Sequence, residues 1–346
     1  MLKEIHFTDS DLDGVGCKLV FKLAHIHEKE GVDFTIINLK HGSIDNEVLE
    51  YIHNGYMTNT VDVDTIISFS DLCPSRECLV EISRTNKIRI WDHHVSAMYA
   101  LEIVPDATIV VENSCGTMQS GTSLLYQHFC NVGFSTTNEV GNFFVRMNRE
   151  LSEFVGLLMD SIRAYDTFEF KRTGDMGPKY LNTLFFMLGY DSFYEKYLDR
   201  ILHFTDGTLV SANDMMFVKA RLDNEKGIIQ KFIDDTVTDK SNGMIIPMDI
   251  RGTRVAFTFG ARGANISELG YQWLKLHPEY DAIASISLGA DKIQFTFRSV
   301  NDTNVADTLA IPMGGGGHAK AAGSVAGKQF TDKLIELIGN TLLNNE

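Results

Sequence analysis

The stretch DSDLDG, residues 9–14, lies between an apolar, strand-like segment at Glu4–Thr8 and a segment with helical spacing at residues 15–28. The apolar side chains of the second segment share one helical face: Val15, Leu19, Leu23 and Ile26. A strand that passes directly into a helix is the repeating unit of parallel α/β sheets. In such sheets this turn lies at the carboxyl edge, where ligands bind. The opening residues therefore predict both the fold class and the place to look for a site.

The pattern of short apolar segments and helical segments continues through the first 110 residues. Further strands are predicted at 33–38, 65–70, 88–91 and 108–111. This alternation predicts an α/β fold with a mostly parallel sheet. The next part of the chain, residues 114–204, reads as largely helical, with helices predicted at Arg146–Tyr165 and Lys179–Phe204.

A second domain is predicted after Asn242-Gly243, where the pattern starts again. Its expected elements are strands at 244–248, 255–259, 282–288 and 293–298, a helix at 266–276 and a final helix at about 328–343. A polar, helix-prone segment at about 211–235 precedes it. With 346 residues and 44% hydrophobic side chains, the chain can form two cores. We therefore expect an N-terminal α/β domain at 1–205, a helical linker at 206–239 and a smaller α/β domain at 240–346.

The charge of the chain argues against binding of long nucleic acid. The net charge is −15, and it divides into −12 for residues 1–205, −3 for 206–239 and zero for 240–346. Proteins that grip long nucleic acid usually carry a basic stripe, and a polyphosphatase would need a basic funnel. Neither is evident, so short anionic substrates are favoured. The acidic excess also fits cation binding, or simply a surface that keeps the protein in solution.

Several features favour a cytoplasmic protein that does not enter membranes. We find no run of about 18 apolar residues and no signal-peptide pattern at the N-terminus. The five cysteines are an odd set without metal-finger spacing, so a disulfide framework is not expected.

The acidic turn at 9–14 is the first candidate site. Its three carboxylates within five residues repel one another unless a cation or strong hydrogen-bond donors lie between them. An EF-hand loop is excluded because its twelfth position is Val20 instead of Glu. A dinucleotide fingerprint fails because Leu19 stands where the third glycine belongs. A solvated turn that caps the following helix stays open as an alternative.

A second cluster ends the strand-like segment at 88–91, where Asp92, His93 and His94 follow one another. Carboxylate and imidazole together suit Mn²⁺, Zn²⁺ or Fe²⁺. Asp71 follows another strand and Asp166 ends a predicted helix; taken singly, each would be read as a cap or turn residue. Together these residues could hold two cations about 4 Å apart, which clamp a hydroxide for in-line attack on a phosphoryl group. A bridging carboxylate is then needed, and Asp71 is the candidate.

The run GGGGHAKAAG at residues 314–323 is the most specific string in the chain. Glycines let backbone N–H groups approach an anion closely, and we expect the small residues that follow to start a helix whose N-terminus favours phosphate. The run is not a P-loop because no Gly-Lys-Ser/Thr ends it. A flexible linker is the alternative.

Taken together, these strings resemble the DHH/DHHA1 phosphoesterase family. Residues 92–94 match the motif that names the family, and Gly315–His318 with Ala321–Gly323 match the signature of its second domain. Within the family, the chain is most similar to B-type nanoRNases, on the strings at 11–17, 122–126, 165–167 and 314–320. The resemblance implies a DHH catalytic domain at 1–205, a helical linker, and a DHHA1 substrate-binding domain at 240–346.

The resemblance also implies roles for individual residues. One metal would be held by Asp9, Asp11 and Asp71, and the other by Asp13, Asp71, His93 and Asp166. His94 would contact the scissile phosphate, and Asp92 would orient the ligands around it. A second phosphate of the substrate would be held by Arg298, Gly314, Gly315, Gly316, Gly317 and His318.

The chain departs from many family members at Asp9, where they have a histidine. An aspartate oxygen is a harder ligand, which tilts the expected cofactor toward two Mn²⁺ ions, with Mg²⁺ as the alternative. His6 could replace it as a ligand, but it lies three residues too early and is expected to belong to the strand.

The leading functional hypothesis is a two-metal phosphodiesterase that cuts oligoribonucleotides of a few residues (nanoRNA) to 5′-mononucleotides. A 3′-phosphoadenosine 5′-phosphate phosphatase, or a phosphodiesterase for cyclic or linear dinucleotides, is the alternative on the same scaffold. An inactive nucleotide-sensing module is a third, opposed by the fact that every metal position is filled. The expected partners are short RNA or small nucleotides, and the sequence leaves cleavage polarity, RNA-versus-DNA preference and homodimer formation open.

Overall fold

The computed structural model describes residues 2–26, 32–39, 44–135, 143–204, 206–237, 245–259, 264–288 and 293–326. The chain divides into two compact units, Met1–Lys219 and Ala220–Glu346. The division falls inside the long helix α10 (Ala212–Val237), which overlaps the segment expected to be a helical linker.

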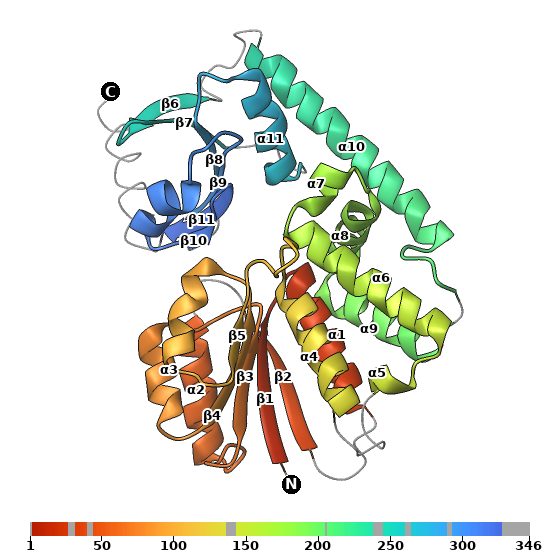
Figure 1. The fold of residues 1–346 in the computed structure, drawn as a ribbon. Coiled ribbons are helices and arrows are strands. Elements are labelled where there is room, and N and C mark those ends of the chain that lie inside the picture. Colours follow the sequence, from red (N-terminus) through yellow and green to blue (C-terminus); the bar gives the residue numbers. More distant parts are fainter. Residues whose placement is uncertain are drawn as a thin grey trace. The chain divides into compact units, whose positions relative to one another are not determined.

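The first unit is built on a five-stranded sheet in the order β2-β1-β3-β4-β5. All of its strand pairs are parallel, which confirms the predicted sheet type. The strands are β1 (Leu2–Asp9), β2 (Val32–Leu39), β3 (Ile66–Ser70), β4 (Lys87–Asp92) and β5 (Ala107–Ile109). Because the strands run in one direction, their carboxyl ends meet at one edge of the sheet (Figure 1).

The register of the central strands places acidic residues side by side at that edge. Thr8 pairs with Ser70, and Ser70 pairs with Trp91. The residues that follow these three, Asp9, Asp71 and Asp92, therefore lie at the same level on neighbouring strands.

Helices cover both faces of this sheet (Figure 1). One face carries α2 (Ile44–Met57), α3 (Arg76–Ser83) and the 3₁₀ segment η1 (Val95–Glu102), and the other carries α1 (Leu12–His25) and α4 (Gly121–Ser135). Helices α2 and α3 were not predicted from the sequence. Each of these helices buries only three residues, which leaves a weak periodic signal.

The helical part of the first unit differs from its prediction at two boundaries. It comprises α5 (Phe143–Arg146), α6 (Arg149–Asp166), α7 (Glu169–Thr173), α8 (Gly177–Leu188) and α9 (Tyr190–Leu202). The single helix expected at 179–204 is wrong, because Gly189 adopts φ 78° and ψ 166° and separates α8 from α9. Helix α6 begins later than expected because the Asn148 side chain accepts a hydrogen bond from Leu151 N at 2.8 Å and caps it.

The second unit contains a mixed sheet in the order β10-β11-β9-β8-β7-β6. Its elements are β6 (Ile246–Ile250), β7 (Thr253–Thr258), α11 (Ile266–Leu276), β8 (Ala282–Leu288), β9 (Ile293–Arg298), η2 (Ala306–Ala310), η3 (Ile311–Met313), β10 (Gly316–His318) and β11 (Ala321–Ala326). Buried side chains of α10 and α11, including Phe232, Leu269 and Trp273, pack against Ala256 and Ile283 of the sheet. These findings confirm the predicted class, an α/β protein with a parallel sheet followed by a smaller α/β part.

The helix expected after the glycine run is a wrong prediction. Residues 321–326 form the strand β11, which pairs with β9 on one side and with β10 on the other. Two strands of small residues fit here because the edge of the sheet is closely packed: a Cβ on Gly315 would lie 2.0 Å from the carbonyl oxygen of Gly323. Met244 and the helix expected at 328–343 lie outside the described residues.

None of the helices within the described ranges combines the length and the apolar character needed to cross a lipid bilayer.

His6 lies inside β1, as expected, and its side chain is fully buried. Its Nδ1 is 2.8 Å from Ser68 Oγ and its Nε2 is 2.8 Å from Ser70 Oγ, while its ring stacks on Phe21. Burial, together with the charge of His25, lowers the pKa of His6 to about 3. The imidazole is therefore neutral in the folded protein and links β1 to β3 below the acidic edge.

This neutral histidine predicts a loss of stability in mild acid. In the unfolded chain His6 becomes protonated below its ordinary pKa of 6.5, whereas in the folded chain it stays neutral down to about pH 3. His6 should therefore reduce the free energy of unfolding by about 2 kcal/mol between pH 7 and pH 5. Urea unfolding of the wild type and of His6→Gln should be measured at pH 7 and at pH 5. The difference in free energy of unfolding between the two proteins should be smaller at pH 5. A difference between the two proteins that stays constant from pH 7 to pH 5 would contradict the prediction.

Candidate active site

The acidic and histidine residues predicted from the sequence meet at the carboxyl edge of the parallel sheet. Ligand atoms of Asp13, Asp71 and His93 lie within 4.8 Å of one another, and so do those of Asp9, Asp11 and Asp71. Asp71 is common to both groups, which is the position required of a bridging ligand.

Asp71 is held in an unusual backbone conformation directly after β3. Its φ is 60°, in the left-handed region, and its N–H donates to Trp91 O at 3.0 Å. The side chain is buried, and its Oδ2 has no hydrogen-bond partner among the described residues. Burial, with the charges of Asp13 and Asp11, raises the pKa of Asp71 well above its usual range. A cation would relieve both the desolvation and the repulsion, so the residues present fit a metal.

His93 connects the sheet edge to helix α6. Its Nε2 lies 3.0 Å from Asp166 Oδ2, and its Nδ1 lies 3.8 Å from Asp71 Oδ1. Burial alone would lower the pKa of His93. The hydrogen bond and charge of Asp166, with the charges of Asp13 and Asp92, outweigh burial and raise the pKa to about 9. In the absence of a cation, the protonated ring thus supplies positive charge to the carboxylates around it.

Asp92 and His94 form a separate pair beside this cluster. Asp92 Oδ1 accepts hydrogen bonds from His93 N at 2.7 Å, from His94 N at 3.1 Å and from His94 Nδ1 at 2.7 Å. Burial opposes the charge on Asp92, but these contacts with His94 outweigh it and lower the pKa of Asp92. Because an ionised carboxylate cannot donate, His94 Nδ1 carries the proton of this contact.

The acidic turn at 9–14 is both a helix cap and part of the cluster. Asp11 Oδ1 accepts a hydrogen bond from Gly14 N at 2.9 Å and caps α1. Asp9 Oδ1 accepts from Ser10 N at 2.5 Å. The turn is so tight that a Cβ on Gly14 would lie 2.0 Å from Asp9 O. The helix cap considered as the alternative for this turn is thus present. The same turn also directs its carboxylates to the sheet edge.

The contacts of Asp13 reveal site residues that were not predicted from the sequence. Its carboxylate accepts hydrogen bonds from Ser120 Oγ, Gly121 N and Thr122 N, at the start of α4. Burial and the charge of Asp166 raise the pKa of Asp13. The sequence signals here were a row of small polar residues before a helix and the match of the string at 122–126 to B-type nanoRNases, and neither assigned these residues to the site.

The residues predicted to bind a second phosphate lie together within the second unit. His318 of β10 pairs with Ala321 of β11, which in turn pairs with Arg298 of β9. Directly opposed residues point to the same face of a sheet, so His318 and Arg298 share a face two strands apart. The guanidinium of Arg298 donates to Ser267 Oγ at the start of α11. The glycines adjoin this face: Gly314 ends η3 with φ 74°, and Gly316 and Gly317 belong to β10.

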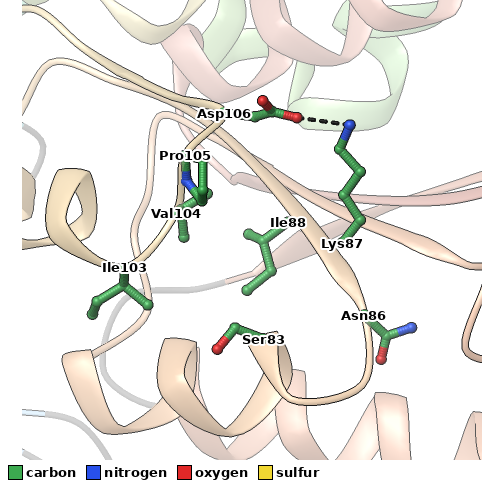
Figure 2. Close-up of a pocket in the computed structure, with 8 residues that line it drawn as sticks. All are labelled: Ser83, Asn86, Lys87, Ile88, Ile103, Val104, Pro105 and Asp106. Atoms are coloured by element: carbon green, nitrogen blue, oxygen red, sulfur yellow. Dashed lines mark ion pairs between the residues drawn. The ribbon is translucent and has the colours of Figure 1, made fainter.

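A separate hollow of about 320 Å³ lies at the other end of the parallel strands (Figure 2). It adjoins Lys87, the first residue of β4, and Asp106, just before β5; their side chains form an ion pair of 2.8 Å. None of the metal-ligand groups found among the described residues includes a residue of this hollow. It is therefore not the candidate active site.

Comparison with known proteins finds a relative that covers nearly the whole chain. No family model matches the chain. Oligoribonuclease NrnB of Bacillus subtilis (strain 168) is 28% identical over 336 residues, which cover 96% of this chain and 74% of that protein. This similarity agrees with the resemblance of the sequence motifs to the DHH/DHHA1 phosphoesterases.

A solved structure shares the fold of this chain. RecJ from Thermus thermophilus, solved in complex with Mn²⁺, matches with a TM-score of 0.50 and 13% identity, over 93% of this chain and 49% of that chain. The pGpG-specific phosphodiesterase PggH from Vibrio cholerae also matches, over 100% of both chains, with a TM-score of 0.45 and 16% identity.

Asp71 provides a test of metal binding by this protein. We expect Asp71→Asn to stabilise the metal-depleted protein, because it removes a buried carboxylate whose Oδ2 has no hydrogen-bond partner within the described ranges. Mn²⁺ at about 100 times its dissociation constant should stabilise the wild type by about 2.7 kcal/mol, a rise of several degrees in Tm. The rise should be absent in Asp71→Asn and retained in Asp64→Asn, which makes the same change at an exposed position. Differential scanning fluorimetry measures all three; an equal rise in every protein would contradict metal binding at Asp71.

Proposed function

We propose that this protein hydrolyses short oligoribonucleotides to 5′-mononucleotides at a site that holds two divalent cations, Mn²⁺ foremost and Mg²⁺ as the alternative. The observation that carries the proposal is the convergence of carboxylates and an imidazole on the buried Asp71. The relative that is 28% identical is named an oligoribonuclease, which supports this substrate class.

The ligands divide into two sets that share Asp71. Asp9 and Asp11 would complete the first set, and Asp13, His93 and Asp166 the second. Bound cations would supply Lewis-acid chemistry, by lowering the pKa of a water nucleophile and neutralising charge on the phosphoryl oxygens. Mostly oxygen donors with a single imidazole suit Mn²⁺, and the all-aspartate first set also tolerates Mg²⁺.

His94 would bind the scissile phosphate through Nε2. Asp92 fixes the orientation of the ring by accepting from Nδ1 at 2.7 Å. A hydrogen bond from Nε2 to a phosphate oxygen would add to the stabilisation of the transition state. Asp92 acts through His94 and through the backbone at 93–94, because its Oδ1 accepts from both amides.

The second unit would bind another phosphate of the same substrate. Arg298 and His318 share one face of its sheet, and the glycine-rich β10 offers backbone N–H groups beside them. A substrate with at least two phosphates could then engage both sites. This requirement favours short oligomers over single mononucleotides.

The substrate class can be tested with 5′-labelled RNA of two to about twenty nucleotides in the presence of Mn²⁺. We expect mononucleotides to be released fastest from the shortest oligomers. Cyclic di-AMP, linear pGpG and 3′-phosphoadenosine 5′-phosphate should be assayed in parallel. Turnover of one of these without release from RNA dimers to pentamers would overturn the oligoribonuclease proposal in favour of that substrate.

His94→Ala tests the division between metal binding and phosphate binding. We expect kcat to fall by a factor of about 10²–10⁴, because a charged hydrogen bond to the reacting phosphate is lost. The Mn²⁺-induced rise in Tm should be unchanged. His53→Ala, which changes an exposed residue of α2, is the matched control and should keep full activity. Loss of the Mn²⁺-induced rise in His94→Ala would show that His94 is itself a metal ligand.

A further inference from the structure

The start of helix α4 is fastened to the acidic turn at the start of α1. Ser120 Oγ donates to Asp13 Oδ1 at 2.8 Å, Thr122 N donates to the same oxygen at 3.1 Å, and Gly121 N donates to Oδ2 at 2.7 Å. Thr122 Oγ1 also donates to the backbone oxygen of Asp13 at 2.7 Å. Asp13 and the three residues at 120–122 are buried, so no solvent competes for these contacts.

These contacts restrict how Asp13 can bind a cation. An ionised carboxylate offers about four lone-pair sites, two on each oxygen. Oδ1 already accepts two hydrogen bonds, from Ser120 and Thr122, whereas Oδ2 accepts one, from Gly121. Only Oδ2 keeps an acceptor site, so Asp13 can present a single oxygen.

The same turn also packs against the proposed bridging ligand. A Cβ on Gly121 would lie 2.6 Å from Asp71 Cβ and 2.8 Å from Asp71 N. Gly121 can approach Asp71 this closely because it has no side chain, and its N–H donates to Asp13. One tripeptide thus fixes the spacing of two carboxylates that come from different elements, Asp13 from helix α1 and Asp71 from the end of β3.

The Ser120 hydroxyl makes hydrogen bonds both to the first turn of α4 and to Asp13. Its Oγ accepts from Ser123 N at 3.3 Å, and Ser123 Oγ in turn accepts from Ser120 N at 2.9 Å. Since a carboxylate cannot donate, the hydroxyl proton of Ser120 must point to Asp13. Ser123 lacks a hydrogen bond to Asp13, although it is a buried serine in the same turn.

We infer that Ser120, Gly121 and Thr122 are positioning residues that hold Asp13 so that Oδ2 alone faces the second cation. The inference rests on the proposed two-metal function, because it concerns how one of the proposed ligands is oriented. The hydrogen bonds and the helix N-terminus also offset part of the penalty of burying the Asp13 charge.

The test is an electron paramagnetic resonance titration of free Mn²⁺ into the metal-depleted, full-length protein. We expect wild type to bind two ions and Ser120→Ala to bind one of them about 10- to 100-fold more weakly, the usual effect of losing a hydrogen bond to a metal ligand. Ser120→Thr keeps the hydroxyl and should restore most of the affinity. Ser123→Ala removes the paired capping hydroxyl without touching Asp13 and should bind both ions as wild type does. Ser120→Cys, which removes the strong donor at nearly constant volume, replaces the alanine variant if circular dichroism shows that the latter does not fold.

Asp13→Asn separates failure of this inference from failure of the proposed function. If Asp13→Asn loses one ion, Asp13 is a ligand and the two-metal site stands. The positioning role would then be overturned by either of two results: Ser120→Ala binds both ions normally, or Ser120→Ala and Ser123→Ala weaken binding equally. Retention of both ions in Asp13→Asn would remove Asp13 from the ligands and overturn both.

Discussion

The site depends on an electrostatic constraint: several carboxylates are buried at one edge of a parallel sheet, where their charges repel one another. The protein provides these carboxylates with unequal numbers of hydrogen-bond donors. Asp13 receives three donors from the start of α4, and Asp92 Oδ1 receives three from residues 93 and 94. Asp71 Oδ2 receives none from the described residues, although Asp71 is buried and shared by both ligand groups. The carboxylate oxygen that the described part of the chain leaves without a donor thus belongs to the residue that two cations would share.

This arrangement costs the fold some conformational freedom. Asp71 adopts a left-handed φ of 60°, which a residue with a Cβ adopts at some cost. Gly14 and Gly121 stand where a methyl group would meet the backbone of Asp9 and of Asp71. Two glycines and one strained aspartate thus bring the ligand-bearing segments closer than ordinary packing allows. Strain gathered in this way at one sheet edge is typical of functional sites, where rigid surroundings maintain it.

The sequence predicted the parts of the site that local patterns determine. Apolar strands that end in Asp9, Asp71 and Asp92 had to meet at one edge, because parallel strands align their carboxyl ends. The contacts of Asp13 with residues 120–122 could not be foreseen, because they join positions more than a hundred residues apart. Two of the donors to the carboxylate are backbone N–H groups, which carry no sequence signal. The strand after the glycine run was missed for a related reason. Small residues favour neither a helix nor a strand, and pairing with β9 decided between them.

Charge also bears on substrate length. Residues 1–205 carry a net charge of −12, whereas residues 240–346 are neutral and include Arg298 and His318 on one face of their sheet. Two cations and His94 would offset the charge of the phosphate being cut, and the Arg298–His318 face would offset that of a second. Each further phosphate of a longer strand would meet an acidic surface, without the release of counterions from a basic track that drives binding of long nucleic acid. The balance of charge therefore favours substrates with few phosphates, independently of any steric limit.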